Sequence, residues 1–122
     1  MTNGDIIRYA IILKIPYFRG VYMRDSLPLK INENETGVVN LDSIRGSGTH
    51  WVAYLKCGFD VEYFDSFGNL RPPIELKRYF NSGPYTTNVT YNFLPKQKEN
   101  TVNCGHLCLD FLTKRINVFN NR

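Results

Sequence analysis

The strongest constraint on the fold is an apolar stripe near the C-terminal end of this 122-residue chain. Its members recur at i, i+3, i+4, i+7 and i+8, which is the spacing of the inward face of an α-helix: Cys104, Leu107, Cys108, Phe111 and Leu112. Asn103 precedes the stripe and is a favourable N-cap residue. The sequence therefore predicts a buried helix that begins at Cys104.

Two further helices are expected earlier in the chain. Asn3 or Asp5 is placed to cap a helix that stops before Pro16, because the residue before a proline avoids the helical region. Pro72-Pro73 suits the start of another helix. The apolar residues of that helix are Leu76, Tyr79 and Phe80.

Short apolar runs bounded by turn residues predict the strands of a sheet. We expect strands at 37–41, 51–56, 61–64 and 89–93, a strand-like connector over 17–28 and a polar surface loop at 32–36. The turn Cys57-Gly58-Phe59-Asp60 joins the second and third of these strands into a hairpin. Helices and strands together indicate an α+β fold.

Length and composition favour a single domain over residues 1–122, with enough apolar surface for a packed core, since 43% of the residues are hydrophobic. The chain shows neither a run of roughly 20 apolar residues nor a signal peptide, so we expect an intracellular protein without membrane association. The formal charge of +4 comes from scattered basic residues, which allows at most weak nucleic-acid binding. A monomer is the default expectation.

Cys104 is the candidate nucleophile. A thiol in the first turn of a helix lies near the positive end of the helix dipole, which favours the reactive thiolate. Gly105 leaves room where a substrate carbonyl would approach, and the Cys104 amide is a possible oxyanion donor. The alternative is that Cys104 is one more core residue, because free cysteine is often buried. Roles for Cys57 and Cys108 stay open.

His50 is the candidate base for that thiol, because it stands where a strand begins, and strand ends commonly present functional groups. A structural histidine beside Trp51 is the alternative. His106 is excluded as the base, since on a helix it lies roughly 200° around from Cys104. The same geometry argues against a metal site made from Cys104, His106 and Cys108.

Asp65 and Gln97 are weaker candidates on their own. Asp65 follows the second strand of the hairpin and should lie beside His50, where its carboxylate can orient the imidazole. Its alternative role is that of a turn residue. Gln97 lies in a polar segment that leads to Cys104, where an amide can complete an oxyanion hole. The residues alone do not favour it over Asn100 or Asn103.

Taken in order, these signals resemble the adenovirus-type (adenain-like) cysteine proteases of viruses and virus-like mobile elements, whose catalytic order is His, Asp or Glu, Gln, Cys. The likeness covers most of the chain from about Gly37 to Leu112. It is carried by Gly48-Thr49-His50-Trp51-Val52-Ala53, Tyr63-Phe64-Asp65-Ser66-Phe67-Gly68, Gln97 and Asn103-Cys104-Gly105. Four spaced motifs in one order are far more specific than any one of them.

The resemblance implies a cysteine-peptidase fold of the adenain and ubiquitin-like-protease type, in which a mixed β-sheet packs against the helix carrying the nucleophile. It also implies that Cys104 is the nucleophile, His50 the base, Asp65 its orienting acid and Gln97 the oxyanion donor. The chain is distinctly shorter than the adenovirus enzymes, so their accessory elements and their activation by a peptide and by DNA are not assumed. No cofactor is expected.

The function that the resemblance implies is cleavage of viral or mobile-element capsid precursors, in the host cytoplasm or nucleus and in the virion. Two alternatives remain. One is an isopeptidase that acts on ubiquitin-like modifiers, and the other is a catalytically silent binding module of the same fold. An intact set of His50, Asp65, Gln97 and Cys104 argues against the silent module.

Overall fold

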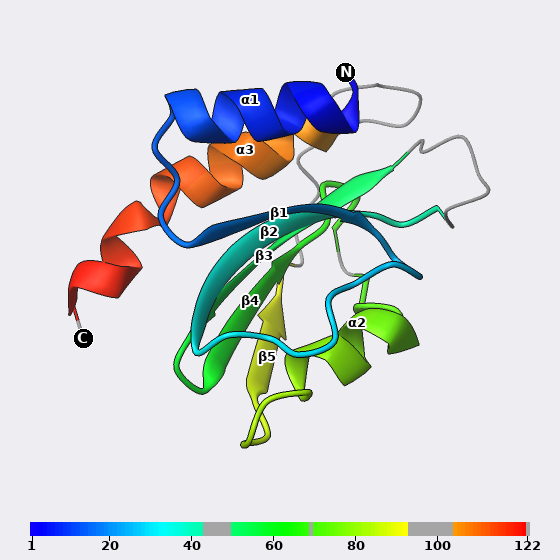
Figure 1. Cartoon of the computed structure of the whole chain (residues 1–122), viewed down its shortest axis with the longest axis vertical. Helices are drawn as coiled ribbons and strands as arrows, with labels where there is room; N and C mark the ends of the chain where they lie inside the picture. The colour runs from blue at the N-terminus through cyan, green and yellow to red at the C-terminus, as the bar shows by residue number, and fades with distance from the viewer. Residues whose placement is uncertain (43–49, 69, 93–103, 122) are drawn as a thin grey trace.

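The computed structural model describes residues 1–42, 50–68, 70–92 and 104–121. Along the chain the elements are α1 (Asn3–Ile12), β1 (Phe18–Met23), β2 (Asn34–Asn40), β3 (Trp51–Cys57), β4 (Asp60–Phe64), α2 (Ile74–Phe80), β5 (Asn88–Tyr91), α3 (Cys104–Lys114) and a 3₁₀ segment η1 (Ile116–Asn121). Figure 1 shows these elements as two helical layers around one sheet. The predicted α+β class is confirmed.

The five strands form one mixed sheet in the order β1-β2-β3-β4-β5. β2, β3 and β4 are antiparallel neighbours, whereas the two edge strands run parallel to their partners. The central strand β3 is buried on both faces, and its side chains alternate between the two helical layers. The predicted hairpin is the pair β3–β4, which turns at Gly58 in the left-handed conformation.

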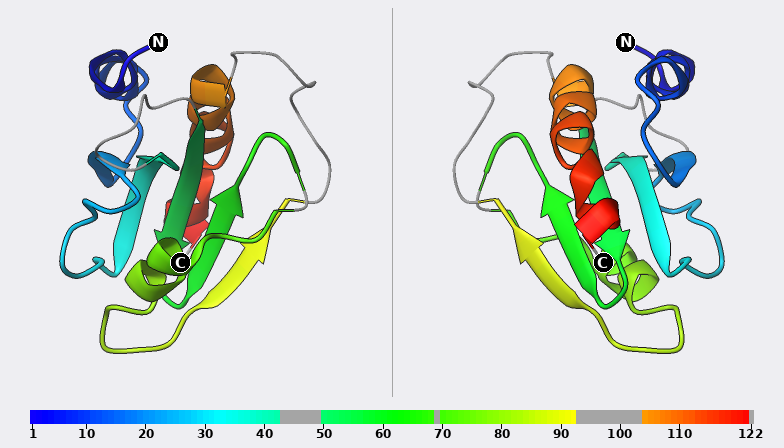
Figure 2. Two further views of the ribbon diagram at one scale, coloured as in Figure 1. Left: turned by 90° about the vertical axis from the view of Figure 1, so that its right-hand side faces the viewer. Right: turned by 90° about the vertical axis from the view of Figure 1, so that its left-hand side faces the viewer.

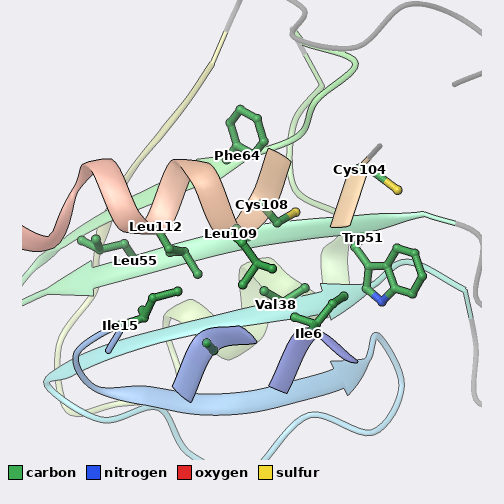
Figure 3. Packing of buried hydrophobic residues seen from close by; sticks show 12 residues of the cluster. Ile6, Ile15, Val38, Trp51, Leu55, Phe64, Cys104, Cys108, Leu109 and Leu112 are labelled. Carbon is green, nitrogen blue, oxygen red and sulfur yellow. The ribbon is translucent and has the colours of Figure 1, made fainter. Parts of the chain in front are cut away.

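Helices α1 and α3 cover one face of the sheet, and α2 covers the other (Figure 1). The turned views in Figure 2 show α1 over β1 and α3 over the middle of the sheet, where it contacts β3. The core under α1 and α3 places Cys104 and Trp51 at the same end (Figure 3). Its buried residues include Ile6, Ala10, Val38, Ala53, Leu55, Phe64, Cys108, Leu109 and Leu112.

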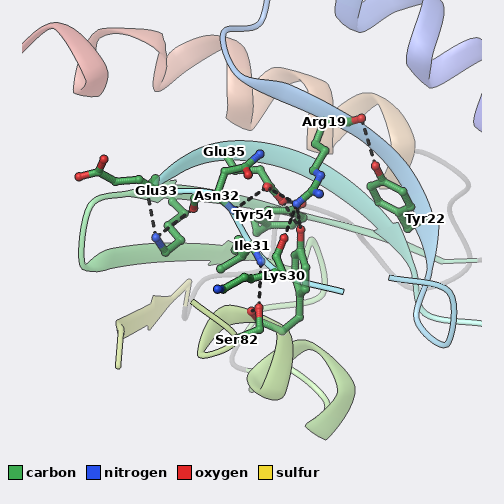
Figure 4. Close-up of polar contacts among 11 residues, drawn as sticks. Arg19, Tyr22, Lys30, Ile31, Asn32, Glu33, Glu35, Tyr54 and Ser82 are labelled. Atoms are coloured by element: carbon green, nitrogen blue, oxygen red, sulfur yellow. Dashed lines mark hydrogen bonds and ion pairs between the residues drawn. The ribbon is translucent and has the colours of Figure 1, made fainter. Parts of the chain in front are cut away.

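The second core, beneath α2, contains a buried polar cluster. The Glu35 carboxylate is fully buried and accepts hydrogen bonds from the hydroxyls of Tyr54 and Tyr79. It also pairs with the Arg19 guanidinium, at 2.9 Å from Nη1 to Oε1 (Figure 4). A buried charge needs such partners, so the cluster ties β1, β2, β3 and α2 together.

Two predictions about local structure are wrong. Thr2, not Asn3 or Asp5, caps α1: its hydroxyl accepts from the Asp5 amide at 3.1 Å, and the Asp5 carboxylate accepts from the Thr2 amide at 2.8 Å. This reciprocal pair is a capping box. The expected polar loop at 32–36 in fact contains the start of β2, because Glu35 and Thr36 are buried in the sheet.

The other predicted elements are confirmed, with boundaries that shift by a few residues. The strand-like connector contains β1, the helix after Pro73 is α2, and the buried helix begins at Cys104. Phe93 lies outside the described residues. Within the described ranges, no helix combines the length and the apolar character needed to cross a membrane.

Candidate active site

The candidate site lies at one end of the sheet, where three elements meet. β3 begins at Trp51 and its antiparallel neighbour β4 ends at Phe64, so the residues flanking these two ends are neighbours. The first turn of α3 packs over β3 at this end. His50, Asp65 and Cys104 are supplied by these three elements.

His50 and Asp65 form a hydrogen-bonded pair, as their adjacency predicts. The distance from His50 Nε2 to Asp65 Oδ1 is 2.9 Å. Asp65 is only 1% exposed, so its carboxylate is shielded from bulk water. The His50 backbone carbonyl accepts from the Leu41 amide at 2.8 Å, which ties the residue to the end of β2.

A turn after β4 holds the Asp65 carboxylate in place. The same oxygen, Oδ1, accepts a hydrogen bond from the Phe67 amide at 3.0 Å. The Gly68 amide donates to the Asp65 carbonyl at 2.9 Å, and Gly68 has φ of 78°, which glycine adopts without strain. Asp65 is therefore both a turn residue and the partner of His50.

Asn92 fixes the Asp65 backbone from the neighbouring strand. Its side-chain oxygen accepts from the Asp65 amide at 2.9 Å, and its side-chain nitrogen donates to the Asp65 carbonyl at 2.7 Å. The β4–β5 register ends at the pair Tyr63 and Tyr91, so the Asn92 amide continues the pairing beyond the last backbone partners. Asn92 was not predicted as a site residue, because it fell within the expected strand 89–93, where the alternation of apolar residues does not mark it as a partner of Asp65.

Cys104 is the other hydrogen-bonding partner of His50. Burial alone would lower the pKa of His50, but hydrogen bonds with Asp65 and Cys104 and their negative charges raise that pKa to about 9, from an ordinary value of 6.5. Since Nε2 faces Asp65, Nδ1 is the ring nitrogen left for the thiol. His50 thus bridges the acid and the cysteine.

The pKa of Cys104 moves in the complementary direction. Burial favours the neutral thiol, but the hydrogen bond with His50, a hydrogen bond from the Trp51 backbone and the positive charge of His50 lower the pKa below its usual 9.0. Cys104 is also the first residue of α3, near the positive end of the helix dipole. Both shifts favour a thiolate–imidazolium pair at neutral pH.

The other two cysteines have different surroundings. Cys108 is fully buried, and burial raises the pKa of its thiol well above the ordinary value, so it stays protonated. The Cys57 thiol donates to the Val118 carbonyl at 3.9 Å, at the far end of β3. Cys104 is therefore the thiol with the surroundings of a nucleophile.

His106 and Gly105 both face away from the site. His106 borders a hollow between α1 and α3 with Tyr9 and Leu13, in agreement with its exclusion as the base. A Cβ atom at Gly105 would meet Met1 Sδ at 2.7 Å and Ile6 Cδ1 at 3.4 Å. The prediction that Gly105 clears a path for substrate is therefore wrong, since the Met1 and Ile6 side chains fill the space beside Gly105.

The remaining predicted site residue, Gln97, lies outside the described residues, together with Asn100 and Asn103. Among the four predicted residues, the structure brings together His50, Asp65 and Cys104. Phe67 also belongs to this group, because its ring stacks on the His50 imidazole. Its signal in the sequence was an aromatic residue within a turn, one residue before a glycine.

Comparisons with known proteins give structural matches only. No family model and no curated protein matches the sequence. Two solved structures of the ASFV pS273R protease, one of them the selenomethionine form, match with TM-scores of 0.59 and 0.58 at 20% identity. They cover 94% and 100% of this chain, which spans about three fifths of theirs, at 57% and 62%. The chain therefore has the fold of the ubiquitin-like-protease group of cysteine proteases, a mixed sheet packed against the helix that carries Cys104.

Proposed function

We propose that this protein is a cysteine peptidase in which Cys104 is the nucleophile, His50 the general base and acid, and Asp65 the residue that orients the imidazole. The single observation that carries the proposal is the position of His50, hydrogen-bonded to Asp65 on one side and to Cys104 on the other. A nucleophile, a base and an orienting carboxylate in one chain of contacts are the parts that thiol-dependent acyl transfer needs.

In the first half-reaction, His50 takes the proton of the Cys104 thiol. The thiolate sulfur attacks the carbonyl carbon of a peptide bond, and the electron pair of the carbonyl moves onto oxygen. Backbone amides at the start of α3 and the Gln97 side chain are the proposed donors to this oxyanion. When the carbon–nitrogen bond breaks, His50 returns the proton to the departing amine, leaving a thioester on Cys104.

In the second half-reaction, water replaces the amine. His50 accepts a proton from the water as its oxygen attacks the thioester carbon. The carbon–sulfur bond then breaks, the acid product leaves, and Cys104 recovers its proton from His50. Asp65 keeps the imidazole in one orientation through both steps and stabilises its cationic form.

The proposed substrates are capsid precursors of a virus or virus-like element, with small residues such as glycine near the cleaved bond. Two considerations support this substrate class: the spaced motifs resemble the adenovirus-type maturation proteases, and the matched structures are those of a viral protease. A ubiquitin-like modifier is the alternative substrate, because the modifier-specific proteases share this fold.

Cleavage of a peptide library is the direct test. The purified chain is incubated with amine-blocked proteome-derived peptides, and new amino termini are identified by mass spectrometry. We expect cleavage that is lost in Cys104→Ala and reduced by about 10² or more in His50→Ala. Cys57→Ala and His106→Ala are the matched controls, and both should cleave like the unmodified chain.

Separate fluorogenic substrates ending in the Gly-Gly tail of a ubiquitin-like modifier distinguish the two substrate classes. Efficient hydrolysis of these substrates, with little cleavage of free peptides, would favour the isopeptidase. If the folded chain cleaves neither set, or if Cys104→Ala cleaves as well as the unmodified chain, the peptidase proposal is wrong.

A further inference from the structure

We propose that Phe67 is a positioning residue for the base, in that its ring holds the His50 imidazole between Asp65 and Cys104 and stabilises the protonated ring. This inference deepens the proposed function and rests on it for its catalytic meaning. Phe67 comes two residues after Asp65, in the turn that follows β4. No role for it was predicted from the sequence.

The two rings are in direct face-to-face contact. Their centroids are 4.4 Å apart and their planes differ by only 7°. Phe67 is 43% exposed, so the rest of the fold covers its side chain only in part. An exposed aromatic side chain in a turn gains little from core burial, so burial alone does not explain its stacking on the imidazole.

The turn that orients Asp65 also positions Phe67. Asp65 Oδ1 accepts from both His50 Nε2, at 2.9 Å, and the Phe67 amide, at 3.0 Å. One carboxylate oxygen therefore fixes the edge of the imidazole and the backbone of the residue whose ring covers the imidazole face. If Asp65 moved, both contacts would change together.

The hydrogen bond and the stack restrict different motions of His50. A single hydrogen bond at Nε2 allows the ring to rotate about the line that joins it to Asp65. A parallel ring 4.4 Å away blocks that rotation, because it occupies the space that a tilted imidazole would enter. Restricting this rotation keeps Nδ1 directed at Cys104, which proton transfer requires.

The stack also stabilises the positive charge of the protonated His50 imidazole. The face of a phenyl ring is electron-rich and attracts a cation that lies within about 6 Å of its centre. Among the described residues, the titratable groups that face His50 are Asp65, from the end of β4, and Cys104, from α3. Phe67 adds a stabilising contact on a face of the imidazolium that neither of these groups covers.

The test measures the pKa of His50 by NMR in the whole chain, with Phe67→Leu and Phe67→Trp compared. Leucine keeps an apolar cover but has no π face, whereas tryptophan keeps one. We expect Phe67→Leu to lower the pKa of His50 by roughly 0.5, about a threefold change in proton affinity, and Phe67→Trp to leave it near its original value. The His106 signal, from a ring that borders the hollow lined by Tyr9 and Leu13, serves as the internal reference in all three spectra.

A kinetic measurement accompanies the titration. The rate of Cys104 alkylation by iodoacetamide at neutral pH should fall by up to roughly threefold in Phe67→Leu and recover in Phe67→Trp. These two readouts need no peptide substrate, so they decide the role of Phe67 even if peptidase activity is never found. Equal His50 pKa values and alkylation rates in the folded leucine variant and the unmodified chain, or equal losses in both variants, would overturn the proposal.

Discussion

The side chain of Asn92 forms hydrogen bonds with both the amide and the carbonyl of Asp65, at 2.9 and 2.7 Å. A carboxamide offers the same donor and acceptor as a peptide group, so it serves Asp65 as an extra backbone partner beyond the end of β5. The residue that orients His50 is thereby attached to the edge of the sheet. The geometry of the site therefore also depends on Asn92, which acts through Asp65.

Replacement of Asn92 should therefore weaken both stability and reactivity. Asn92→Ala leaves the amide and the carbonyl of the buried Asp65 without these partners, and we expect the free energy of unfolding to fall by about 2 kcal/mol. Denaturant unfolding measures this loss, and iodoacetamide measures the accompanying slower reaction of Cys104. Asn88→Ala, an exposed position in β5, should stay within about 0.5 kcal/mol of the original stability. Equal stabilities for the two variants would contradict the bridging role of Asn92.

The buried cluster around Glu35 predicts a contrast between two ion pairs. Glu35→Ala leaves Arg19 without its carboxylate and removes the acceptor of the Tyr54 and Tyr79 hydroxyls. We expect a loss of about 3 kcal/mol or more in the free energy of unfolding, since breaking a buried pair strands its partners.

The exposed pair Glu62–Arg115 is the control for that contrast. Its atoms are also 2.9 Å apart, but both side chains are solvent-accessible. Glu62→Gln should cost at most about 1 kcal/mol, because water screens the pair. The free energies of unfolding of both variants are measured by chemical denaturation under one set of conditions. Similar losses would show that burial does not determine how strongly the Glu35 cluster stabilises the fold.

The reactivity of Cys104 should depend on pH in a way that requires His50. Because the pKa of Cys104 is lowered, its alkylation rate should rise at a lower pH than that of an ordinary thiol. In His50→Ala the onset should move to higher pH, since burial is then opposed by the backbone hydrogen bonds from Trp51 and Gly105 but no longer by His50. His106→Ala should leave the onset where it is.

On the alkaline side, the pKa of His50 sets the pH at which peptidase activity should decline. His50 loses its proton as the pH rises through about 9, so the imidazolium that protonates the departing amine disappears. Peptidase activity should decline over that interval even though Cys104 stays ionised. Activity that keeps rising through this range would mean that protonated His50 is not required.

The sequence predicted those elements whose burial follows a simple period. The α3 stripe and the alternation along β3 are apolar patterns of this kind. Both elements are present, although the buried residues of α3 are Cys104, Gly105, Cys108, Leu109 and Leu112, and the predicted stripe members Leu107 and Phe111 are only partly buried. The start of β2 was missed because Asn34-Glu35-Thr36 is polar, and a buried Glu35 is recognisable only once Arg19, Tyr54 and Tyr79 are known to surround it. Contacts between residues distant in sequence leave no local period.

For the same reason, some contacts of the candidate site could be predicted from the sequence and others could not. Hairpin geometry was enough to place Asp65 beside His50, since neighbouring strands fix that distance. Asn92, Phe67 and the true packing of Gly105 depend on side-chain directions that spacing does not give. The role proposed for Gln97 came from the family resemblance, and it stays a prediction.

Covalent labelling at neutral pH tests the central claim, an activated Cys104–His50 pair, most directly. The purified chain is treated with an electrophilic peptide probe beside Cys104→Ala, His50→Ala and the control His106→Ala, and the labelled residue is identified by mass spectrometry. We expect one label on Cys104, lost in Cys104→Ala, strongly reduced in folded His50→Ala and unchanged in His106→Ala. Labelling of Cys57, or labelling of Cys104 at the same rate without His50, would contradict it.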